Sequence, residues 1–160
     1  MSSTRITRHI NAPRANVYRA LLDPNAIANW MVPDGMTSRV HDFNAREGGA
    51  FRISLMYEAP TVTGKTSAHT RTTHGRFVKL VTNKKVVEVV EFETTDPAMR
   101  GEMTITFSLA EAGGGSDLLA VHDGLPKGLS PADNEAGWRM LLAKLAALVE
   151  KKEHDRKGEP

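Results

Sequence analysis

The histidine at position 122 is the first side chain whose placement predicts chemistry. It falls in a run, Asp117–Asp123, that alternates as a strand does, and it shares one face with Leu118 and Ala120. If that face is covered, a neutral imidazole there could hydrogen-bond to a ligand oxygen or act as a general base. The structural alternative is a hydrogen-bonded histidine that orients the loop before Pro126.

Three glutamates, Glu88, Glu91 and Glu93, form the second candidate group. They lie in a run rich in β-branched residues, where alternation puts Glu88 on the opposite face from the other two. At least one carboxyl group therefore meets whichever face is covered, and burial would raise its pKa and suit it for acid or base catalysis. The alternative is a strand end near solvent, or salt bridges to Arg52 or Arg76. The catalytic candidates are His122, Glu91 and Glu88.

Other site chemistries find no pattern in the chain, and we expect neither a metal nor a cofactor. The sequence has no cysteine. His69 and His74 would point to opposite faces of a regular strand, and His41 could approach them only through tertiary structure. The run from Gly113 to Gly115 lacks the Lys-Ser/Thr of a phosphate loop, and no Gly-x-Ser-x-Gly elbow is present.

A long C-terminal helix is the element that must position such a site. Ser130 can cap its N-terminus, Pro131 fits its first position, and Asp133 suits the positive end of its dipole. Apolar residues then recur at steps of three and four and form one face: Trp138, Leu141, Leu142, Leu145, Leu148 and Val149. We expect this helix to run to Lys152 and to need a large apolar partner surface.

The partner surface is predicted to be an antiparallel sheet. A first strand at Thr4–Ile10 precedes two short helices that begin near Pro13 and Pro24. Alternating runs separated by turn residues, from about residue 38 to residue 123, then predict five or six strands in a meander, with a loop at residues 58–68. The fold class is therefore α+β, with a curved antiparallel sheet packed on the long C-terminal helix.

Composition narrows the remaining possibilities. The 160 residues, 40% hydrophobic and 25% charged, predict one domain over residues 1–152 with a polar tail at 153–160. Basic residues are scattered and the net charge is only +2, so nucleic-acid binding is not expected. The chain has no apolar run long enough for a membrane span, and its polar N-terminus lacks a signal-peptide core, so we expect a cytoplasmic location.

Several phrases of the sequence carry a family resemblance. They are His9–Pro13, Val17–Leu21, Trp30 before Pro33, Gly48–Phe51, Gly75–Val78, His122–Pro126 and Asn134–Trp138 with Leu142 and Leu145. In these phrases and in its order of elements, the chain resembles the START/Bet v 1-like (SRPBCC) superfamily, within it the group related to the C-terminal domain of the activator of the Hsp90 ATPase. The resemblance implies a helix-grip fold, in which a curved sheet wraps around the C-terminal helix and leaves an apolar cavity.

For function, the resemblance implies first the binding of an apolar or amphipathic small molecule, since members bind lipids, sterols and polyketides. Two alternatives follow: a cyclase- or hydrolase-type enzyme that uses His122 or a buried glutamate, and an Hsp90-associated stress-response module. Against the chaperone alternative, the helix-grip domain fills this chain, whereas eukaryotic activators carry a separate N-terminal domain. The edge strands of an open sheet could also pair in a homodimer.

The predicted cavity combines the inward faces of the strands with the apolar face of the helix. Its expected lining residues are Trp30, Phe51, Ile53, Leu55, Tyr57, Met103, Ile105, Phe107, Leu118, His122, Trp138 and Leu142. Trp30 ends a short helix, and we expect it at the cavity mouth.

Overall fold

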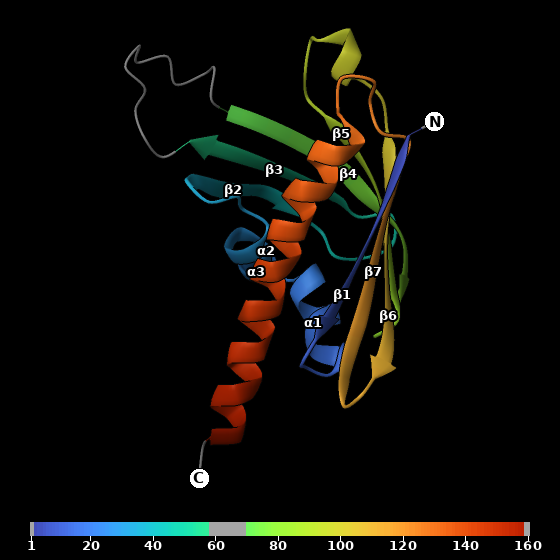
Figure 1. Ribbon diagram of the computed structural model, residues 1–160. Coiled ribbons are helices and arrows are strands. Elements are labelled where there is room, and N and C mark those ends of the chain that lie inside the picture. The colour runs from blue at the N-terminus through green and yellow to red at the C-terminus, as the bar shows by residue number, and fades with distance from the viewer. Residues whose placement is uncertain (1, 58–69, 159–160) are drawn as a thin grey trace.

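The structure is a computed structural model that describes residues 2–57 and 70–158. Within these residues, seven strands form one antiparallel sheet and three α-helices lie on its concave side (Figure 1). The strands are β1 (Ser3–Ile10), β2 (Met36–Phe43), β3 (Ala50–Tyr57), β4 (Thr70–Val81), β5 (Lys85–Phe92), β6 (Met103–Ala112) and β7 (Gly115–Asp123). The helices are α1 (Arg14–Leu22), α2 (Pro24–Trp30) and α3 (Pro131–Gly158), and a short 3-10 helix, η2 (Pro97–Met99), lies between β5 and β6.

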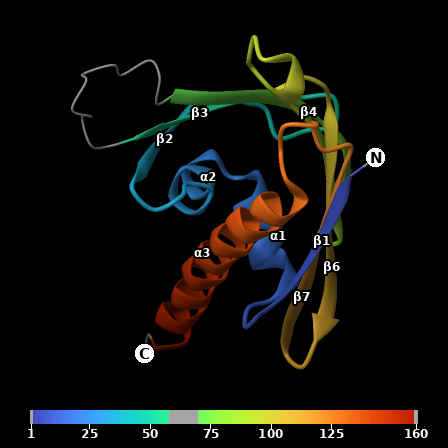
Figure 2. The same cartoon turned by 45° about the horizontal axis from the view of Figure 1, so that its top comes forward.

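The strands form a meander with one addition. From β2 to β7, each strand pairs with the next one in the chain, and β1 pairs with β7 at the far edge. The sheet bends so that its two halves face α3 from different sides (Figure 2). The predicted helix-grip architecture, with two short helices after the first strand and a long C-terminal helix, is confirmed. The loop predicted at residues 58–68, and His69, lie outside the described residues.

Strand alternation decides which side chains face the helices. On β6, Met103 and Ile105 are buried, whereas Thr104 between them is half-buried on the convex side. Gly75 on β4 allows the sheet to pack closely here. A Cβ at this position would stand 2.7 Å from the Phe51 ring and 2.1 Å from a carbonyl oxygen of β5, both closer than a real Cβ approaches.

The long helix begins as its capping residues predict. The backbone N–H of Asp133 donates to the Ser130 hydroxyl at 3.3 Å, and that of Asn134 donates to the Ser130 carbonyl at 2.9 Å. Leu142 and Leu145 are fully buried against the sheet and the short helices. The helix continues to Gly158, beyond the predicted end at Lys152. None of the described helices is both long enough and apolar enough to cross a membrane.

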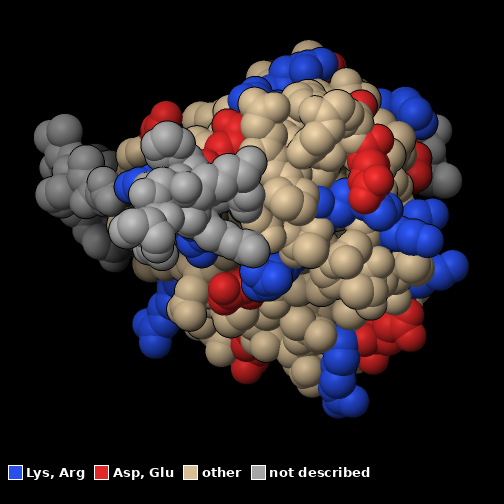
Figure 3. Space-filling model, turned by 90° about the horizontal axis from the view of Figure 1, so that it is seen from below, with Lys and Arg blue, Asp and Glu red and all other residues tan. Residues whose placement is uncertain are grey.

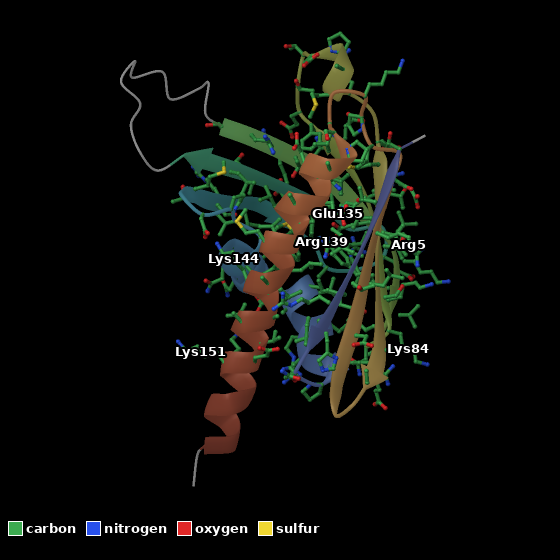
Figure 4. All side chains as sticks on the ribbon, in the orientation of Figure 1. Arg5, Lys84, Glu135, Arg139, Lys144 and Lys151 are labelled. Carbon is green, nitrogen blue, oxygen red and sulfur yellow. The ribbon has the colours of Figure 1, made fainter. Side chains whose placement is uncertain are left out.

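The two short helices fill one end of the concave side. Asp23 caps α2, where its carboxylate accepts the Asn25 N–H at 2.9 Å, and Trp30 ends α2 with its indole N–H donating to the Ala20 carbonyl at 3.0 Å. From α3, the Lys144 ammonium donates to the Val32 carbonyl just after α2 (Figure 4). These bonds hold α1, α2 and α3 against one another on the concave side of the sheet.

Candidate binding cavity

A cavity of about 200 Å³ lies between the concave side of the sheet and the first turns of α3. Its walls come mainly from β3, β4, β5, β6 and α3, with contributions from the short helices and the segments next to them. Of the predicted lining residues, the structure brings together Phe51, Ile53, Leu55, Met103, Ile105 and Trp138. The wall is apolar over most of its surface, so a bound molecule would contact mainly carbon.

The indole ring of Trp138 closes the cavity toward the core. Its ring centroid lies 5.9 Å from that of Phe107, 6.3 Å from that of Trp30 and 4.7 Å from that of His122. Trp138 is in the wall, whereas the other three are fully buried behind it and contribute no atom to the wall. The physical reason is that the large indole fills the space through which they would otherwise reach the cavity.

Three further predicted residues also lie outside the wall. Leu118 and Leu142 are completely buried and pack in the core between the sheet and α3. Tyr57 ends β3, and its side chain is outside the described residues. Trp30, expected at the mouth, is instead 1% exposed, because its indole N–H bonds to α1 and draws the ring inward.

Glu88 is the buried acid of the cavity. It lies on the inward face of β5, opposite Phe77 on β4 and Ile105 on β6, and it is 7% exposed. Among the described residues its carboxyl group has neither a hydrogen-bond partner nor an ion-pair partner. Burial raises the pKa of Glu88 from 4.5 to about 8, so the group is mostly protonated at neutral pH. Glu91 lies on the opposite face of the sheet, where it is close to His74.

His122 lies in the same cross-strand row as Glu88, but it is not in the cavity wall. Its register partners are Ile105 on β6 and Thr4 on β1, and the imidazole points inward, as the alternation of β7 predicts. Neither ring nitrogen finds a hydrogen-bond partner within the described residues. Burial lowers the pKa of His122 from 6.5 to about 4, so the ring is neutral over most of the pH range.

A few other polar groups reach the cavity. Asn134 of α3 is in the wall and donates from its side-chain amide to the hydroxyl of Thr4 at 2.9 Å, which fixes the helix to β1. Asp133 stands beside it on the first turn of α3, and Arg71 stands on β4 with its guanidinium over the Phe92 ring at 5.9 Å. Arg71 and Asp133 are exposed, whereas Glu88 is buried, so Glu88 is the buried ionisable group among the described wall residues.

The convex side of the sheet carries the paired charges. Arg52 donates two hydrogen bonds to Glu93, at 2.8 and 2.9 Å, and His74 contacts the same carboxylate at 3.0 Å. These partners, Arg52 first, lower the pKa of Glu93 to about 2 despite partial desolvation. Arg76 pairs with Glu102 rather than with the glutamates of β5. Basic and acidic side chains are also interspersed on the face seen in Figure 3. The described residues hold no group of three side chains suited to bind a metal ion.

Several wall residues were not recognised from the sequence. They are Leu21, Ile27, Met31, Pro33, Phe43, Arg71, Thr73, Val90, Phe92, Leu129, Asp133, Asn134, Gly137 and Leu141. Alternation along β5 could have found Val90 and Phe92, which share a face with Glu88. Helical spacing could have found Gly137, which lies on one face with Asn134 and Leu141.

Comparisons with known proteins agree with this architecture. The family described as Activator of Hsp90 ATPase homolog 1-like protein matches the chain over residues 11–150. The solved structure of protein CV1439 from Chromobacterium violaceum is 34% identical, covers 92% of this chain and 96% of its own, and superposes with a TM-score of 0.84. An AHSA1 protein from Silicibacter pomeroyi is 17% identical, with coverages of 94% and 99% and a TM-score of 0.77, and so supports the fold alone.

A protein from Rhodobacter sphaeroides shows the same fold at 17% identity, with coverages of 94% and 93% and a TM-score of 0.78. No curated protein matches the chain. The family match spans nearly all of the elements that surround the cavity, from the segment after β1 to the apolar face of α3. The chain therefore belongs to the family of Activator of Hsp90 ATPase homolog 1-like proteins, and it has the helix-grip fold of a ligand-binding type of domain.

Proposed function

We propose that this protein binds a small amphipathic molecule in the cavity between the sheet and α3. The observation that carries the proposal is an apolar chamber with one unpaired, deeply buried acid, Glu88, in its wall. Binding sites typically combine apolar walls with a few polar groups that fix orientation. A carboxyl group left without a partner in such a wall lowers stability, and such groups are common at functional sites.

The size of the cavity restricts the ligand. An engineered protein cavity of about 150 Å³ takes up benzene, whereas pockets for drug-sized molecules have about 300–1,000 Å³. The volume of about 200 Å³ therefore suits a molecule with one ring and a short substituent. A sterol or a long-chain lipid exceeds this space, so of the ligand classes that the family resemblance implies, the small ones fit best.

The two alternative functions receive less support. An enzyme that works in this cavity would use Glu88 for proton transfer, because His122 lies behind Trp138 and contributes no atom to the wall. A chaperone-associated module would be expected to expose an apolar patch. Among the described residues, Val78 is the one large hydrophobic side chain that is markedly exposed, at 48%.

Gly137 provides a direct test of the proposal. A Cβ at this position would meet no atom within 4 Å, and the residue lies in the cavity wall. We expect Gly137→Phe to fold, because the ring enters open space and glycine is replaced by a better helix former, and to fill the cavity. Ala136→Phe is the matched control, because Ala136 neighbours Gly137 but is exposed.

Native mass spectrometry of freshly purified protein, followed by extraction after unfolding, provides the first measurement. We expect a discrete mass excess in the wild type and in Ala136→Phe, and none in Gly137→Phe. For a ligand lost during purification, 2-phenylethanol serves as a probe, with the fluorescence of the two tryptophans, Trp30 and Trp138, as the signal. If neither measurement distinguishes Gly137→Phe from its control, the cavity is not a binding site.

A further inference from the structure

The charges around Glu88 indicate the chemistry of the ligand. The charged and titratable groups in the described cavity wall are Glu88 on β5, Asp133 on α3 and Arg71 on β4, and neutral His122 lies beyond Ile105. Arg71 stands at the exposed end beside Phe92, which is four positions along β5 from Glu88, or about 13 Å. None of the described cations forms an ion pair or a hydrogen bond with the Glu88 carboxyl group, and burial accounts for its raised pKa.

Two aromatic rings near the acid, those of Phe51 and Trp138, are in the same cavity wall. Phe77 is the cross-strand neighbour of Glu88, and its ring centroid lies 5.2 Å from that of Phe51, which is in the wall. On the other side, beyond Ile105, the Trp138 ring closes the cavity. The faces of aromatic rings attract a cation, and this attraction strengthens when water is excluded.

A buried acid among apolar and aromatic side chains favours some polar groups of a ligand over others. An anionic ligand would be repelled by Glu88 once the acid ionises, and it would find its counter-charge only at exposed Arg71. A neutral alcohol or ketone could take one hydrogen bond from the protonated acid. A basic nitrogen gains more, because an ammonium group and a carboxylate form a charge-assisted hydrogen bond in a water-poor site.

We propose that the ligand of this cavity is an apolar, one-ring molecule that carries a basic amine, and that Glu88 binds its nitrogen. This inference rests on the proposed function and names the chemical class of the ligand. The amine lies at the inner end, beside Glu88 and the aromatic rings, and the apolar part extends along β5 toward Phe92. The site thus recognises a hydrophobic amine by one ion pair and by the exclusion of water.

The protonation of Glu88 makes the binding pH-dependent. In the free protein the acid holds its proton up to a pKa of about 8, whereas an alkylamine, like a lysine side chain, holds its own proton up to a pH of about 10. The ammonium group binds the carboxylate, so binding releases the proton of Glu88 to water. Affinity for the amine should therefore rise about tenfold per pH unit between about pH 6 and about pH 8, where the gain ends.

The experiment compares two nearly isosteric probes, 2-phenylethylamine and 2-phenylethanol, by titration calorimetry at about pH 6, 7 and 8. We expect the amine to bind more tightly with rising pH and to release a proton, seen as heat that depends on the buffer. The alcohol should bind equally at about pH 6 and 7 and lose affinity near pH 8, because only the protonated acid donates to it.

Glu88→Gln removes the charge and keeps the shape. We expect this variant to bind the amine at least about tenfold more weakly at pH 8 and to lose the pH dependence, while 2-phenylethanol binds as before. Glu91→Gln, the same change on the convex side of β5, should leave both affinities unchanged. Thermal unfolding of both variants checks that they are folded.

The outcomes separate this inference from the proposed function. If the alcohol binds but the amine binds no better, or if Glu88→Gln leaves amine binding intact, the cavity is a binding site and the amine inference is wrong. If neither probe binds the wild type at any of these pH values and no copurifying mass is found, the proposed function itself is contradicted.

Discussion

Two glutamates close together in the chain lie on opposite sides of the sheet and have opposite pKa shifts. Glu88, on the concave side, has no partner among the described residues, and burial raises its pKa to about 8. Glu93, just after β5 on the convex side, is held by Arg52 and His74, which lower its pKa to about 2. The same side chain is therefore mostly neutral on one side and ionised on the other.

The difference shows that position relative to the helices, rather than residue type, decides what a carboxyl group can do. A paired, half-exposed carboxylate contributes modestly to stability and has its hydrogen-bonding capacity already occupied. A buried, unpaired acid lowers stability but keeps its capacity free for a ligand. The concave side thus keeps a carboxyl group free for the proposed ligand, whereas the convex side uses its carboxylate in ion pairs.

The largest effect on stability is expected when the buried acid, Glu88, is replaced. Because burial raises the pKa of Glu88, the ionised carboxylate disfavours the folded state. The folded state is therefore most stable, as far as this group is concerned, below about pH 4.5, and that stability is lost as pH rises through about 8. We expect Glu88→Leu to raise the free energy of unfolding by about 3 kcal/mol at pH 8 and by much less at pH 5. Urea unfolding at both pH values measures the difference. An equal effect at the two values would mean that Glu88 is already ionised at pH 5.

His122 extends the contrast to a base in the same buried row. Burial lowers the pKa of His122 to about 4, so the folded state resists protonation of this ring. As pH falls from about 6.5 to about 4, this resistance should lower the free energy of unfolding of the wild type by about 2–3 kcal/mol. Replacing His122 by leucine should remove this part of the decline, which urea unfolding at pH 7 and pH 4 would detect. His122→Ala is a poor substitute, because full burial against Trp138 means that truncation leaves a void.

The smallest effect is expected on the convex side. Glu93→Gln should lower stability by only about 0.5–1 kcal/mol at neutral pH, since the carboxylate and its partners are partly exposed and screened. The contribution of this carboxylate is present above about pH 4.5 and is lost as pH falls through about 2. Added salt should shrink the difference between variant and wild type at pH 7. A loss as large as the Glu88 effect would remove the distinction between the two sides.

The sequence predicted the elements well because their signals are local. Capping by Ser130, the face of α3, and the alternation that separates Glu88 from Glu91 depend on neighbours within a few positions. The concave side could not be assigned to Glu88 in advance, because that choice depends on the register of β5 with β4 and β6. Nothing in a short stretch of chain encodes that register.

The composition of the cavity wall was harder to predict for a related reason. Trp30 and His122 have the residue types of a ligand site, but the side chain of Trp138 stands between them and the cavity. Arg71 has no sequence signal of its own and becomes a wall residue only when β4 is placed against β3 and β5. Which side chain fills a space is decided by packing across elements that are far apart in sequence.

The pairing of β1 with β7 also has a consequence for the order of folding. Thr4 on β1 bonds to Asn134 on α3, 130 residues later in the chain, and within the described part of the chain β7 is the one strand that pairs with β1. During synthesis the first strand must therefore wait until nearly the whole chain has emerged, and contacts this distant form slowly. Five wall residues, from Asp133 to Leu141, belong to α3, so the cavity wall is complete only after this late segment of the chain has been made and has packed on the sheet.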